Sequence, residues 1–268
     1  MILLEEEREV ILPYTSFDLQ KTPHLFQRKK RLGAIGLESW VEVGHSIHGT
    51  ISLPLTAHSI PHLFFILCNR PHSQGHEMGT QGLYFKEYSE LNSQNFTAKI
   101  PNETHLHEYP DLSLIEWTIS GTLGKPLTLE LDVHGKEFNS WPLQEGDTFE
   151  LSRTRLYYFE KENLFLNDEM PQGLQSFSWG YETGEEGSQE IRLNLIFSRR
   201  NQLSPGYHKI DLSFSNPFHF EKNQNARFQI YLRALFHSQR RYKDTNLYSL
   251  QLVVCSIQVR TLLNAEML

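Results

Sequence analysis

The chain has 268 residues, and its 25 Lys and Arg against 32 Asp and Glu give a formal net charge of -7. This length allows one large domain or two smaller ones, each with its own core. Hydrophobic residues at 39 % and aromatic residues at 12 % argue against disorder. The acidic balance disfavours broad binding to nucleic acid backbones, which requires a basic surface.

The composition also limits the cellular setting. The only two cysteines, Cys68 and Cys255, lie in apolar runs, so we expect buried free thiols and no disulfide scaffold. The first twelve residues carry acids where a signal peptide has its apolar core. No apolar run approaches the roughly 18 residues of a membrane helix. We therefore expect a cytoplasmic protein without a membrane span.

Residues 1–36 are predicted to form an N-terminal arm. Glu5 to Glu9 suit a short helical turn, and Pro13 and Pro23 prevent a longer helix. The densest basic run of the chain is Arg28 to Arg31. We interpret it as a solvated face or a contact to the acidic N-terminus, with a nuclear address or an anionic partner as alternatives.

Residues 37–162 read as a β-sandwich or jelly-roll-like domain. Alternating apolar residues predict half-buried strands, and the continuous apolar run from His62 to Cys68 predicts a strand buried on both faces. A change of phase near Leu114 and Ile115 predicts a bulge. The predicted strands of this domain are 39–43, 51–55, 62–68, 83–88, 95–100, 112–119, 127–133 and 155–160.

Residues 163–187 are rich in Asn, Asp, Glu, Gly and Pro, which is typical of a linker or a long loop. Residues 188–268 are then a second β unit, which could belong to the same sheet system. Its longest strand changes face near Val254 and Cys255, again the pattern of a bulge. The predicted strands here are 191–197, 210–214, 228–236 and 247–259.

Many short alternating segments without a convincing amphipathic helix predict an all-β fold. We expect an antiparallel β-sandwich or jelly-roll-like architecture, made of one large domain or two packed β domains.

The strongest cluster of metal-ligating residue types is His105, His107 and Asp111. Residues i and i+2 of a strand point to the same face, so both imidazoles could reach one divalent metal ion. Asp111 could supply a carboxylate ligand from the next turn. A metal-dependent small-molecule enzyme or binder is therefore one alternative function.

This pattern resembles the first motif of cupin barrels, in which His-x-His is followed by an acidic ligand and a glycine. The later Gly146-Asp147 before a strand resembles their second motif. The resemblance covers residues 105–159 and implies a metal-binding barrel. Two positions depart from it, because Asp111 stands where cupins usually have Glu and no His follows Gly146-Asp147. The chain is not assigned to that family on this basis.

Phe177, Trp179 and Tyr181 alternate with small residues and would form an aromatic face on a strand. Such a face suits stacking on a sugar ring, which makes a carbohydrate-binding module a further alternative. Packing in the core between sheets is the other interpretation of the same three residues.

No complete catalytic motif is present, so we expect a non-enzymatic protein and name no catalytic residue. The leading prediction is a binding or assembly protein that uses the loops and sheet edges of a β-sandwich. Residues 69–82 and 163–187 are the predicted contact regions. The expected partner is another protein or a further copy of the chain, and no cofactor is expected unless a divalent metal binds.

Overall fold

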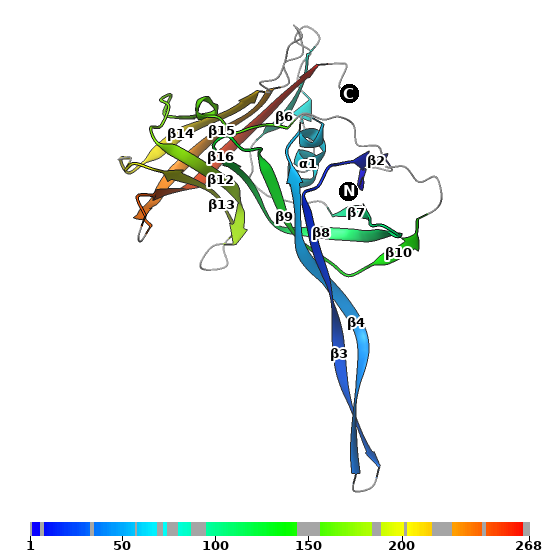
Figure 1. The fold of residues 1–268 in the computed structure, drawn as a ribbon. Coiled ribbons are helices and arrows are strands. Elements are labelled where there is room, and N and C mark those ends of the chain that lie inside the picture. Colours follow the sequence, from blue (N-terminus) through cyan, green and yellow to red (C-terminus); the bar gives the residue numbers. More distant parts are fainter. Residues whose placement is uncertain are drawn as a thin grey trace.

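The structure is a computed structural model of the chain (Figure 1). It describes residues 2–5, 8–32, 35–56, 58–68, 72–73, 80–86, 95–143, 156–183, 189–200, 203–215, 227–242 and 245–264.

Nearly all regular structure in the described residues is antiparallel β, which confirms the predicted fold class. One continuous path of paired strands runs β11-β14-β15-β16-β13-β12-β8-β7-β1-β2, and the remaining strands branch from it. Strands from both sides of residues 163–187 therefore share one sheet system. The strands are β1 (Ile2–Glu5), β2 (Arg8–Ile11), β3 (Ser16–Leu32), β4 (Ile35–Pro54), β5 (His72–Ser73), β6 (Thr80–Lys86), β7 (Phe96–Pro101), β8 (His105–Thr122), β9 (Thr128–Gly135), β10 (Asn139–Pro142), β11 (Leu164–Leu166), β12 (Leu174–Thr183), β13 (Gln189–Phe197), β14 (Tyr207–Ser215), β15 (Arg227–Arg241) and β16 (Tyr248–Asn264).

The sheet curves so that strands far apart in its order face each other. Phe177 on β12 stacks on Phe214 on β14 with ring centroids 5.9 Å apart, although three strands separate β12 from β14 in the sheet. Phe159 contacts Phe177 edge-on from the segment before β11. These rings fill the space between the two layers, which is the sandwich-like core that the alternation predicts.

β12 lies in the middle of this sheet, so the prediction that residues 163–187 form a linker or long loop is wrong for 174–183. β12 pairs with β13 on one side and with β8 on the other. Its alternating aromatic residues have the period-2 pattern of a strand. The polar composition of the surrounding residues instead favours a loop, which is why the prediction fails here. Gly180 is required at this position, because a Cβ there would lie 2.2 Å from the carbonyl oxygen of Trp117.

Residues Ser59–Cys68 form helix α1 and not the predicted buried strand. Thr56 and Ser59 begin it with reciprocal bonds, since each backbone N–H donates to the other residue's hydroxyl at 2.9 Å. The buried residues Ile60, Leu63, Ile66 and Leu67 recur at helical spacing. A short continuous apolar run does not by itself distinguish a strand from a buried helix. No helix in the described part of the chain is long and apolar enough to span a membrane.

Three smaller predictions are also corrected. Of the helical turn expected over residues 5–9, Glu5 lies in β1 and Arg8 and Glu9 lie in β2, whereas residues 6–7 lie outside the described residues. Of the strand predicted at 155–160, the structure describes residues 156–160, which make isolated bridges at Leu156 and Tyr158 and no named strand. The thiol of Cys255 is exposed, whereas we expected it to be buried; the side chain of Cys68 lies outside the described part.

Both predicted bulges are confirmed. The pairing of β8 with β9 shifts register between Leu114 and Glu116. The pairing of β15 with β16 shifts where Arg233 pairs with Ser256 and Ala234 with Val254, which leaves Cys255 as the extra residue.

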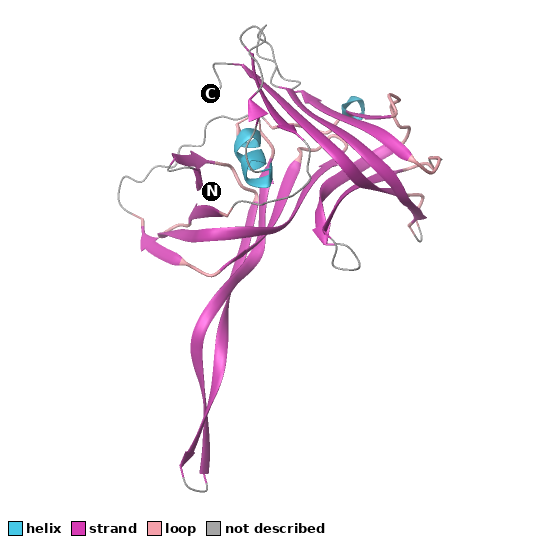
Figure 2. Cartoon of the chain, turned by 180° about the vertical axis from the view of Figure 1, so that it is seen from behind, coloured by secondary structure: helices cyan, strands magenta, loops and turns pink. Residues whose placement is uncertain are grey.

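The most conspicuous feature of the shape is the β3–β4 hairpin, which projects far from the rest of the molecule (Figures 1 and 2). The two short strands predicted at 39–43 and 51–55 are parts of the single strand β4, and β3 runs through Pro23, which pairs with His45. β9 pairs with the part of the hairpin nearest the body, and the far part meets no third strand among the described residues.

Candidate functional site

The projecting part of the hairpin begins where β9 ends. β9 pairs with β4 from Pro54 to Ile47, and its last pair is Ile47 with Gly135. Beyond this pair β3 and β4 continue to bond only to each other among the described residues, from Thr22 opposite Ser46 to Leu32 opposite Ile35. We call this two-stranded segment, residues 22–32 and 35–46, the ribbon.

Large apolar side chains of the ribbon are exposed. The exposed fractions are 54 % for Leu25, 60 % for Phe26, 62 % for Trp40, 43 % for Val41 and 67 % for Val43. Monomeric proteins expose single apolar residues routinely, but several large ones on one element point to a contact surface.

These side chains occupy both faces of the ribbon. Phe26 is the cross-strand partner of Val41, and Gln27 is the partner of Trp40. Cross-strand partners share a face and successive residues alternate between faces, so Phe26 and Val41 lie on one face and Trp40 lies with Leu25 on the other. A bulge opposite His24 and Leu25 leaves Val43 unpaired in the ladder. Each face of the ribbon therefore carries exposed apolar side chains, and neither face is purely polar.

Histidines from three strands gather where the ribbon leaves the body. His48 on β4 is paired with His134 on β9, with ring centroids 4.5 Å apart. His24 on β3 makes a hydrogen bond of 3.1 Å between its Nε2 and the Ser46 hydroxyl. Burial, and then the neighbouring His48, Lys136 and His24, lower the pKa of His134 below its ordinary value.

His105 and His107 lie on β8 with their rings nearly parallel and 6.3 Å apart, on the same face as their spacing indicates. Asn102 donates from its Nδ2 to His107 Nε2 at 2.6 Å, and the Thr104 hydroxyl bonds His105 Nδ1 at 2.8 Å. These contacts occupy one ring nitrogen of each histidine.

Asp111 is directed to a different partner. Its carboxylate accepts a hydrogen bond of 2.6 Å from Asn95 Nδ2, and its backbone has a positive φ of 53°. Within the described residues, no three His, Cys, Asp or Glu side chains form a group that could hold a metal ion. The structure therefore brings the two histidines together without Asp111, and the metal site stays a prediction.

The aromatic residues Phe177, Trp179 and Tyr181 point into the core. They are at most 9 % exposed, and Trp179 lies edge-on to Trp117 with ring centroids 5.0 Å apart. This arrangement corresponds to the core-packing interpretation, and it leaves these rings without an open face on which a sugar could stack.

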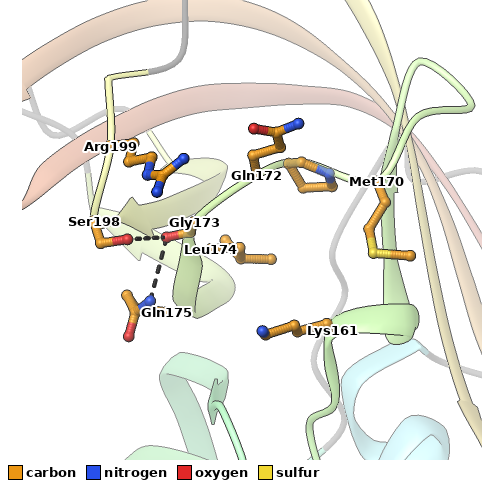
Figure 3. A pocket seen from close by; sticks show the side chains of 9 residues that line it. Lys161, Met170, Gln172, Gly173, Leu174, Gln175, Ser198 and Arg199 are labelled. Atoms are coloured by element: carbon orange, nitrogen blue, oxygen red, sulfur yellow. Dashed lines mark hydrogen bonds between the residues drawn. The ribbon is translucent and has the colours of Figure 1, made fainter.

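The predicted contact region 163–187 does border a pocket of about 410 Å³ (Figure 3). Met170, Gln172 and Gln175 line it together with Ser198 and the cations Lys161 and Arg199. Ser198 Oγ and Gln175 Nε2 both donate to the Gly173 carbonyl, at 3.2 and 3.4 Å. Both cations are exposed, so the pocket provides no desolvated group to fix a ligand. Of the other predicted contact region, 69–82, only residues 72–73 and 80–82 are described, in β5 and β6.

Sequence reasoning did not identify the ribbon. Its signal is the adjacent apolar pairs Leu25-Phe26 and Trp40-Val41 on either side of a turn-like Gly-Ala sequence. Adjacent apolar residues break the period-2 pattern of a half-buried strand, and in a two-stranded ribbon they place apolar groups on both faces.

Comparison of the whole chain with models of known protein families, and with curated protein sequences, gave no match.

Proposed function

We propose that the chain is a non-enzymatic assembly protein whose ribbon inserts into a partner. The observation that carries this proposal is the exposure of five large apolar side chains on both faces of a projecting two-stranded ribbon. The curved sheet forms the body of the molecule, and the ribbon projects from it (Figure 1).

The energetics favour a covered ribbon. Moving a side chain such as Phe, Leu or Val from water into an apolar contact is worth about 1.5–3 kcal/mol when burial is complete. A two-stranded ribbon without a third strand or a packed face is marginally stable in water. A partner that covers the ribbon supplies the missing contacts and stabilises the ribbon by doing so.

The edges of the ribbon support the same proposal. Beyond Ile47 the outer edges of β3 and β4 meet no further strand in the described part of the chain. Unpaired N–H and C=O groups along such edges are templates for pairing with another polypeptide. A protein partner can satisfy these edges and the apolar faces together, which a small molecule cannot.

The test compares the purified 268-residue chain with the F26S/V41S variant, which makes one face of the ribbon polar. We expect wild type to run well above its monomer mass of 31.4 kDa, alone or with a co-purifying protein, and the variant to run as a monomer. The matched control I115T replaces an apolar residue of β8 that is 44 % exposed and should behave as wild type. A wild-type monomer at micromolar concentration with no bound protein would contradict the proposal.

A further inference from the structure

We propose that the partner of the ribbon is a second copy of this chain, and that the ribbon of one copy docks on the body of the next. This inference rests on the function proposed above and adds the identity of the partner and the head-to-tail mode of contact.

The distribution of charge is the first argument. The ribbon contains Arg28, Lys29, Lys30 and Arg31 against Glu38 and Glu42, a formal charge of +2. The whole chain is at -7, so the rest of the chain carries -9. The four cations stand in the last five residues of β3, opposite Ser39 to Gly36 of β4, at the far end of the ribbon. A basic tip on an otherwise acidic molecule is complementary to the body of an identical molecule.

The same charges argue against a ribbon-to-ribbon dimer. Two ribbons of +2 placed side by side repel each other, whereas a ribbon against a body of -9 is attracted. The two apolar faces lead to the same conclusion, because a second ribbon laid on one face would leave the opposite face in water. The head-to-tail mode therefore requires a receiving surface on the body that covers both faces of the ribbon.

A contact between two different surfaces has a consequence for stoichiometry. Each copy that donates its ribbon still offers its own receiving surface, so the contact is heterologous and generates a ring or an open chain. The structure therefore points to assemblies larger than a dimer. Because the contact is partly electrostatic, raising the salt concentration should weaken it.

The principal experiment places a photo-crosslinker on the ribbon. Trp40 is replaced by p-benzoyl-phenylalanine in the 268-residue chain, and ¹⁵N-labelled and unlabelled copies are mixed before illumination. We expect mixed-isotope cross-links that join position 40 of one copy to residues outside the ribbon of another. Cross-links between two ribbons would overturn the head-to-tail mode, and cross-links confined to one copy would overturn the contact between copies.

A charge reversal with a matched control tests the electrostatic argument. K29E/K30E should weaken self-association at least tenfold in sedimentation velocity. K125E/K136E makes the same change in net charge at two exposed lysines of the body, and it should change self-association less than twofold. Equal losses of self-association in the two variants would overturn the proposed electrostatic contribution of the basic residues at the end of the ribbon.

Two further outcomes separate this inference from the proposed function. A monomeric chain that binds a different protein through the ribbon would overturn the second copy as partner and leave the assembly function intact. Tight binding of a labelled RNA or DNA duplex, lost in K29E/K30E but not in K125E/K136E and without cross-links between copies, would also overturn it. A monomer that binds neither would overturn both.

Discussion

Phe26 and Val41 are direct cross-strand partners on the ribbon, and each exposes more than two fifths of its side chain to solvent. In most sheets such a pair packs beneath a second layer and contributes to folding. Here it stabilises little beyond the ribbon itself, because β9 ends at the pair Ile47–Gly135, before the ribbon begins. The pair is therefore available to a partner.

The first prediction concerns the stability of the body when this pair is removed. F26S/V41S should lower the free energy of unfolding by less than about 1 kcal/mol, since exposed positions contribute little to the folded state. Urea unfolding under conditions in which wild type is monomeric measures this value. A loss of several kcal/mol would mean that the pair belongs to the folding core and not to a contact surface.

The second prediction tests the burial of the central aromatic cluster. W179A should destabilise the protein by about 3–5 kcal/mol, because it removes a fully buried indole that packs against Trp117. W141A removes an indole that is 46 % exposed on β10 and should cost less than about 1 kcal/mol. Similar costs for the two variants in urea unfolding would contradict the observed placement of Trp179.

The third prediction concerns the close approach of β8 and β12. G180A would place a Cβ 2.2 Å from the Trp117 carbonyl oxygen, which requires the two strands to separate. We expect a loss of roughly 2 kcal/mol or more in the free energy of unfolding. G44A is the control, since its added Cβ would meet no atom within 4 Å. G44A should leave the free energy of unfolding within about 1 kcal/mol of the wild-type value. A loss in G44A as large as that in G180A would contradict the steric explanation.

The fourth prediction concerns pH. The pKa of His134 lies below its ordinary value of 6.5 in the folded protein, mainly because of burial and then because of His48. Above pH 6.5 the imidazole of His134 is neutral in both the folded and the unfolded state. Its protonation then takes nothing from the free energy of unfolding. As the pH falls from 6.5 to the lowered folded pKa, the unfolded state binds a proton that the folded state does not, and stability is lost.

Urea unfolding at pH 7.5 and pH 5 measures this effect. Wild type should lose more free energy of unfolding between these two values than H134Q does. H237Q replaces an exposed histidine on β15 and should lose as much as wild type. An identical pH dependence in wild type and H134Q would contradict the prediction.

The fifth prediction addresses the histidine pair on β8. In H105A/H107A we expect loss of the Asn102 and Thr104 side-chain hydrogen bonds at a cost of about 1 kcal/mol each or less, since both are exposed. Chelator treatment of the wild-type protein should not change its melting temperature. A stoichiometric bound metal that the double substitution removes, or a melting temperature that falls with chelator, would instead support the metal-site hypothesis.

Period-2 alternation predicted most of the sheet, including the register shifts at Leu114 and Cys255, because a strand with one buried face must alternate and a bulge must break the alternation. The sequence of helix α1 predicts a strand because its apolar run is short and almost uniformly apolar. Such a run shows no polar face that would indicate a helical period. The overall composition of residues 163–187 predicts a loop for β12, because its polar neighbours outweigh its own alternating aromatic residues.

The candidate site followed from the sequence only in part. The i, i+2 spacing of His105 and His107 gave the correct face, but the position of Asp111 depends on a local left-handed backbone that no motif indicates. The ribbon was beyond local reasoning, since Leu25-Phe26 and Trp40-Val41 have no core to alternate against. Whether a strand pair lies on the body or projects from it depends on where the third strand, β9, ends.

Hydrogen exchange of the ribbon amides as a function of protein concentration tests the central claim most directly. Exchange within residues 22–46 should be at least tenfold slower in the assembled protein at high concentration than after dilution to monomers, while exchange in β8 and β12 should stay the same. Equal exchange of the ribbon at both concentrations, with the protein assembled at the higher one, would show that the ribbon is not the contact and would contradict the account.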